Sequence, residues 1–172
     1  MPDLEHRRTA RLTFHRPRPE DLEDYLGLHS DPVVTATLGG PRTPEQTRDF
    51  LARTLAHWET HGFGWWILRD PETGRFVGRG GIRYNTFEIG EVLELGYAFV
   101  PDCWGRGLAT ELARESLRVG FEELELPEVV AITRPDNFAS RRVLEKAGMR
   151  LDGEITWVGL PHVLYRVRRG DL

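Results

Sequence analysis

The stretch "CWGRGLATEL", residues 103–112, places two glycines beside an arginine and leads directly into residues with helical spacing. Glycine leaves the backbone bare and permits positive φ values, so main-chain N–H groups can come close to a ligand. The first turn of a helix offers N–H groups and the positive end of the helix dipole, which together favour an anion such as phosphate. The stretch therefore predicts a phosphate-binding turn at the start of a helix.

The residues after the glycines exclude two common phosphate-binding motifs. A P-loop needs a lysine and a hydroxyl residue directly after its last glycine, whereas Gly107 is followed by Leu108 and Ala109. A dinucleotide-binding fingerprint needs Gly or Ala at the position of Thr110 and an acidic residue closing the next strand, where "VVAITR" has none. The pyrophosphate of coenzyme A is the third candidate. A tight turn that packs closely on its helix, with no ligand, is the alternative.

Alternating strands and helices of one domain surround this turn. Apolar spacing and turn signals predict the order β-α-α-β-β-β-α-β-α-β-β. The strand, helix and strand that follow Glu91 require a parallel crossover within a mostly antiparallel sheet. We expect an α/β (α+β) fold whose sheet has about seven strands flanked by four helices. For the helix over 44–61, the sequence predicts Thr43 as the N-cap and Gly62 as the end.

Composition limits the function further. The chain has 172 residues with 23 basic and 27 acidic side chains, so its net charge of −4 gives no broad basic surface for nucleic acid or an anionic membrane. No apolar stretch approaches the ~20 residues that span a bilayer. Cys103 is the single cysteine and the six histidines have no metal-ligand spacing. We expect a cytoplasmic protein without a metal.

Four stretches resemble, in order and spacing, the GNAT superfamily of N-acetyltransferases and its branch of ribosomal-protein N-terminal acetyltransferases. They are "TARLTFHRPRPEDLEDYLGLHSDP", "GGPRT", "LELGYAFVPDCWGRGLATE" and "RPDNFASRRVLEKAGM". The family's phosphate loop has the pattern Q/R-x-x-G-x-G/A, which "WGRGLA" matches at Gly107 and Ala109, with Trp104 where Gln or Arg is usual. The resemblance covers about residues 9–169 and implies a GNAT-like fold over a single domain, 1–172.

This resemblance implies an acetyl-CoA site. Phe99 and Val100 would offer main-chain groups to the pantetheine arm, and Asn137 would contact the pantetheine amide or cap its helix. The residues expected to hold the pyrophosphate are Trp104, Gly105, Arg106, Gly107, Leu108, Ala109 and Thr110.

Two further residues are candidates for the chemistry. Glu94 lies on the strand that leads to the loop and would act as a base through a water molecule; a solvated sheet residue is the alternative. Many family members have a tyrosine seven residues after the asparagine that corresponds to Asn137. This chain has Leu144 at that position. Ser140 would instead donate a hydrogen bond to the coenzyme sulfur, or it is simply a helix residue capped by Asn137.

The expected reaction is direct attack by a primary amine on acetyl-CoA in a ternary complex. The acceptor would be a protein N-terminus or a small molecule such as a polyamine or an aminoglycoside, and a homodimer is common in this branch. The alternative function is a non-catalytic acyl-CoA-binding domain. The residues that would line the acceptor side are Trp58, Trp65, Trp66, Trp157 and His162. Packing in the core is the alternative for the tryptophans.

Overall fold

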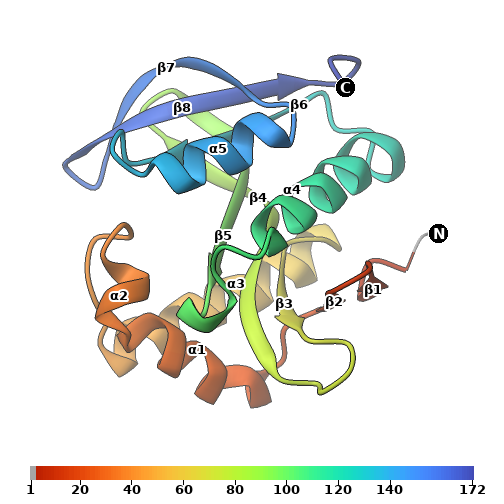
Figure 1. The fold of residues 1–172 in the computed structure, drawn as a ribbon, viewed down its shortest axis with the longest axis vertical. Coiled ribbons are helices and arrows are strands. Elements are labelled where there is room, and N and C mark those ends of the chain that lie inside the picture. Colours follow the sequence, from red (N-terminus) through yellow and green to blue (C-terminus); the bar gives the residue numbers. More distant parts are fainter. Residues whose placement is uncertain (1–2) are drawn as a thin grey trace. The chain divides into compact units, whose positions relative to one another are not determined.

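The computed structural model describes residues 3–172. Its backbone contacts form two compact units, one of residues up to Gly80 with Tyr97–Leu108 and one of Gly81–Gly96 with Ala109–Leu172. Figure 1 labels the long strands β4 (Phe76–Phe87) and β5 (Gly90–Phe99). Each of them contributes residues to both units. The two units are therefore connected by the continuous backbone of these two strands.

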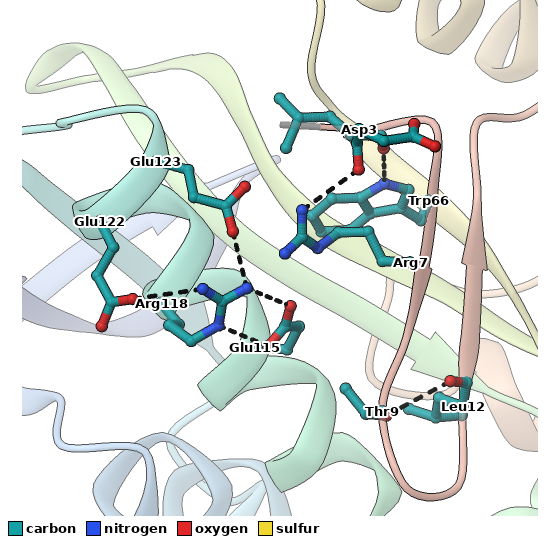
Figure 2. Close-up of polar contacts among 10 residues, drawn as sticks. Asp3, Arg7, Thr9, Leu12, Trp66, Glu115, Arg118, Glu122 and Glu123 are labelled. Carbon is teal, nitrogen blue, oxygen red and sulfur yellow. Dashed lines mark hydrogen bonds and ion pairs between the residues drawn. The ribbon is translucent and has the colours of Figure 1, made fainter. Parts of the chain in front are cut away.

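The first unit begins with a hairpin. It consists of β1 (His6–Arg8) and β2 (Thr13–His15), and β2 also pairs antiparallel with β3 (Trp65–Arg69). Thr9 bonds to the Leu12 carbonyl across the turn, and the Trp66 indole donates to the Leu4 carbonyl at 2.7 Å (Figure 2). The sequence predicted one strand here. The polar β1 carries no apolar alternation, so its pairing left no pattern to detect.

The helices of this unit are the 3-10 turn η1 (Pro19–Asp21), α1 (Leu22–Ser30), α2 (Pro32–Thr35) and α3 (Pro44–His61). The N-cap of α3 is confirmed: the Thr43 hydroxyl accepts from the Gln46 N–H, and the Gln46 side chain accepts from the Thr43 N–H. Its end at Gly62 is confirmed too, with φ 73°. The sequence missed the short α2, which Asp31 caps.

A buried arginine lies within the aromatic core of the first unit. The Arg79 guanidinium carbon is 4.8 Å from the Phe50 ring centroid and 4.7 Å from that of Trp65, and its Nε donates to His29 Nε2 at 3.1 Å. Burial, together with the charges of Arg79 and Arg42, lowers the pKa of His29 to about 2. The tryptophans at positions 58, 65 and 66 are all buried, so they pack in the core.

The second unit holds the remaining elements. They are α4 (Leu108–Arg118), which starts in the first unit, the π-helical turn η3 (Val119–Glu123), β6 (Glu128–Thr133), α5 (Phe138–Lys146), β7 (Arg150–Trp157) and β8 (Leu160–Arg168). Strand β6 pairs parallel with β5 and antiparallel with β8, and β8 pairs antiparallel with β7. The predicted parallel crossover is therefore confirmed.

Over residues 3–172 the sheet has eight strands in the order β1-β2-β3-β4-β5-β6-β8-β7, with five α-helices. This confirms the mixed, mostly antiparallel class. The additional strand and helix are β1 and α2. No helix in the same residues combines the length and the apolarity needed to cross a membrane.

Helix α4 is amphipathic, as its sequence predicted. Leu112, Ala113 and Leu117 are almost fully buried on one face. Arg118 bonds to Glu115 and Glu123 at 2.8 Å and to Glu122 at 3.3 Å (Figure 2). These carboxylates raise the pKa of Arg118, so the guanidinium stays charged. The network ties the helix to its π-helical end.

Candidate active site

The glycine turn follows β5 and is open to solvent. After the short turn η2 (Pro101–Cys103), residues 104–107 are exposed and Leu108, the first residue of α4, is buried. Gly105 and Gly107 have φ values of 72° and 79°, which glycine adopts without steric cost. The structure therefore has an exposed glycine turn directly before a helix, as the sequence predicted. Such a turn can accommodate an anionic phosphate group.

Two side chains hold this turn. The Trp104 indole donates to the Phe99 carbonyl at 2.8 Å, while half of the Trp104 side chain stays exposed. Arg11 donates from Nη1 to the carbonyl of Arg106. The sequence offered no signal for Arg11, because it lies 95 residues before its partner.

The main-chain groups of Val100 already bond within the protein. Its N–H donates to the Val77 carbonyl at 2.9 Å, and its carbonyl accepts from the Cys103 N–H at 3.0 Å. The Phe99 carbonyl accepts the Trp104 indole. A carbonyl oxygen has two lone pairs, so each can still accept a second donor. The role of Phe99 and Val100 toward pantetheine stays a prediction.

Glu94 lies where β5 meets β6. Among the described residues, the parallel register between these strands consists of one pair, Glu94 with Val130. The Glu94 residue is 8% exposed; its Oε2 accepts from Asn85 Nδ2 at 2.8 Å and lies 3.5 Å from Arg83 Nε. Glu94 is therefore a buried, oriented carboxylate rather than a solvated one. Strand alternation could not reveal Arg83 and Asn85, because both come from β4.

Helix α5 begins at the predicted cap. Asn137 Oδ1 accepts from the Ser140 N–H at 3.2 Å, so Ser140 is the third residue of a capped helix. Both residues are half-buried, and Leu144 is fully buried at the position of the family's usual tyrosine. The cap uses the backbone N–H of Ser140, and the role of the Ser140 hydroxyl toward sulfur stays a prediction.

A tyrosine that the sequence did not single out lies beside α5. The Tyr165 hydroxyl donates to Glu145 at 2.9 Å and accepts from Arg141 Nε at 3.1 Å. Burial raises the pKa of Tyr165, so the phenol stays protonated. This contact fastens α5 to β8.

The candidate residues divide between the units. Phe99, Val100 and residues 104–108 belong to the first, whereas Glu94, Ala109, Thr110, Asn137 and Ser140 belong to the second. The first unit also has a cavity of about 200 Å³ between α1 and the end of β5, lined in part by Glu23, Asp24, Asp31 and Val100. Residues 3–172 contain no group of three or more His, Cys, Asp or Glu side chains that could hold a metal ion.

A glycine turn that is exposed to solvent at the start of a helix is a feature of proteins that bind a phosphate-bearing ligand. A family model described as an acetyltransferase (GNAT) domain matches residues 11–150, and the chain belongs to this family. The protein is therefore an acetyltransferase, and acetyl-CoA is its co-substrate.

Three relatives illustrate the match. YkkB of Bacillus subtilis (strain 168) is 36% identical over 158 residues, 91% of this chain and 92% of YkkB. The crystal structure of an acetyltransferase from Agrobacterium tumefaciens str. C58 has a TM-score of 0.84 at 30% identity and covers 95% of this chain and 94% of its own. Spermidine N-acetyltransferase from Vibrio cholerae, in complex with CoA and spermine, shares the fold with a TM-score of 0.76 at 14% identity, covering 95% and 98%.

Proposed function

We propose that the protein transfers the acetyl group of acetyl-CoA to a primary amine by direct attack in a ternary complex. The observation that carries this proposal is the solvent-exposed turn with positive φ at Gly105 and Gly107, running into α4, in a chain of the GNAT family. The form "CWGRGLATE" and the Ser140 that follows Asn137 support a finer placement beside the ribosomal-protein N-terminal acetyltransferases.

In this proposal the loop holds the coenzyme. Main-chain N–H groups of residues 105–110 bind the pyrophosphate at the start of α4. Trp104, whose own N–H donates to the Pro101 carbonyl at 3.0 Å, flanks this site. Phe99 and Val100 pair with the pantetheine arm, and Asn137 contacts its amide. The exposure of residues 104–107 supports this arrangement, because a ligand can reach their backbone directly.

The chemical step forms one bond and breaks another. The amine nitrogen attacks the thioester carbonyl carbon, the C–N bond forms, and the C–S bond breaks to release the coenzyme thiolate. Glu94 takes the amine proton through a water molecule, and the thiolate, with a hydrogen bond from Ser140, takes a proton from solvent. An α-amine with a pKa of about 8 needs only a weak base at neutral pH, whereas a lysine side chain with a pKa of about 10.4 needs a stronger one. Alignment of two bound substrates supplies most of the acceleration.

Two classes of amine are candidates for the acceptor. At the cavity in the first unit, Asp24 pairs with Arg69 at 2.7 Å and Asp31 caps α2. The cavity therefore supports a cationic small molecule such as a polyamine mainly through the carboxylate of Glu23. The branch resemblance favours a protein N-terminus. A screen for these acceptors should therefore contain both peptides and polyamines.

The test is release of free coenzyme A from acetyl-CoA in the presence of N-terminal peptides, spermidine or an aminoglycoside, with the acetylated product identified by mass. We expect release with at least one amine, above the rate of hydrolysis. Tight coenzyme binding without turnover would favour a non-catalytic acyl-CoA-binding domain, for which the buried Leu144 at the usual tyrosine position is the supporting observation. If calorimetry detects no binding of acetyl-CoA and no amine causes release of coenzyme A, both functions are refuted.

We also propose that residues 1–172 work as one domain with a core over about 9–169, since β4 and β5 run through both units. The one cysteine, Cys103, is a free and buried thiol, which suits a reducing compartment such as the cytoplasm. A homodimer is proposed from the branch resemblance alone, and light scattering of the purified protein tests it.

A further inference from the structure

We propose that Arg11 is a positioning residue for coenzyme binding, one that aims the Gly107 N–H at the pyrophosphate. This inference rests on the coenzyme site proposed for the glycine turn. Arg11 and the loop residues Arg106 and Gly107 all belong to the first unit, although they lie far apart in sequence.

The guanidinium of Arg11 spans the peptide between Arg106 and Gly107. Its Nη1 donates to the Arg106 carbonyl, and its Nη2 lies 3.3 Å from where a Cβ on Gly107 would be. A side chain at this position would therefore press on the guanidinium, in addition to the strain of a φ of 79°. The guanidinium of Arg11 therefore lies beside both residues of this peptide.

The hairpin that carries Arg11 is anchored firmly. The next residue, Leu12, is fully buried, as is Phe14 on β2. The Thr9 N–H donates to the Leu12 carbonyl at 2.9 Å and closes the turn. Arg11 thus projects from a fixed point, and its hydrogen bond to the loop fixes the orientation of one peptide plane there.

That orientation determines where the next donor points. In a trans peptide the C=O and the N–H lie on opposite sides of the C–N bond. When Arg11 holds the Arg106 oxygen on its own side, the Gly107 N–H faces away from the hairpin, at the start of α4. A hydrogen bond to a carbonyl also polarises its peptide group and strengthens the N–H as a donor. Arg11 therefore prepares an anion-binding N–H before the coenzyme arrives.

The experiment measures binding of coenzyme A and of its fragments to the whole protein. Arg11→Met keeps the aliphatic stem but removes the donor, and we expect it to weaken binding of coenzyme A and of 3′-dephospho-coenzyme A about tenfold each. Pantetheine, which lacks the pyrophosphate, should bind the variant and the wild type equally in competition. Arg11→Lys keeps a donor and should recover most of the affinity. KM for acetyl-CoA should rise with the same ratio while kcat changes little.

Two controls separate this role from a merely structural one. Arg8→Met removes an equal charge from an exposed position of the same hairpin and should leave binding unchanged. Gly107→Asp tests the loop itself and should abolish tight binding. Wild-type affinity in Arg11→Met, an equal loss for pantetheine, or a loss restricted to ligands with the 3′-phosphate would each overturn the role of Arg11 alone. Unchanged affinity in Gly107→Asp would overturn both this role and the proposed coenzyme loop.

Discussion

Glu94 is a carboxylate oriented by two neighbours, the amide of Asn85 and the guanidinium of Arg83. If it accepts the amine proton through water, Glu94→Gln should lower kcat about 100-fold, within the usual range for loss of a general base. The remaining activity should move to higher pH, because the amine must then lose its proton to solvent. Initial rates between pH 6 and 10, with the identified acceptor, provide the measurement.

The matched control is Glu91→Gln, an exposed glutamate on the same strand, which should retain full activity. Calorimetry should show that Glu94→Gln binds acetyl-CoA as tightly as the wild type. Rates that equal the wild type at every pH would remove Glu94 from the mechanism.

For single residues, the sequence predicted local roles, such as turn glycine or helix cap, better than it predicted which distant side chains contact them. The glycines of the turn and the cap at Asn137 follow from local rules, because φ preferences and capping act within a few residues. Arg11 and Arg83 could not be predicted in the same way. Their contacts depend on which loop and strand the fold brings close, and no local spacing encodes that.

Among the elements, α5 joins a capping residue to a candidate catalytic one, and substitution separates the two roles. Asn137→Ala removes the oxygen that accepts from the Ser140 N–H, and it should lower the free energy of unfolding by about 1 kcal/mol. Ser140→Ala keeps that backbone donor, so it should lower the free energy of unfolding less than Asn137→Ala does, while its kcat should fall. Urea titrations and acetyl-transfer rates on both variants provide the comparison. A Ser140→Ala enzyme with unchanged kcat would make this serine a helix residue only.

The elements that the sequence predicted correctly carry their own boundary signals. Helix α3 has a capping box at Thr43 and a left-handed glycine at its end. By contrast, β1 is three polar residues whose place depends on pairing with β2. Helix α2 is a single short turn that begins at Pro32, so the proline that follows α1 also starts the next helix.

At the scale of the whole chain, the crossover between β5 and β6 followed from the order of elements, but the position of the last hairpin did not. Strand β8 lies between β6 and β7, so the strand that comes later in sequence lies further inside the sheet. Burial explains this order: β8 is mostly buried and β7 mostly exposed. A polar edge strand protects a sheet from pairing with other chains, and the hairpin turn alone could not say which strand takes that place.

The stability of the folded chain should depend on pH through His29. Its pKa is lowered from 6.5 to about 2 in the folded protein, by burial first and then by the charges of Arg79 and Arg42. Between these pH values the unfolded chain binds a proton that the folded chain does not, so the free energy of unfolding decreases as the pH falls below 6.5. The slope contributed by this group is about 1.4 kcal/mol per pH unit.

In His29→Gln, where an amide oxygen can still accept from Arg79, this contribution is absent. Urea titrations from pH 8 to 4.5 should therefore show a steeper loss of stability in the wild type than in the variant below pH 6.5, and equal slopes above pH 7.5. Parallel curves over the whole range would show that His29 gains its proton without unfolding the core.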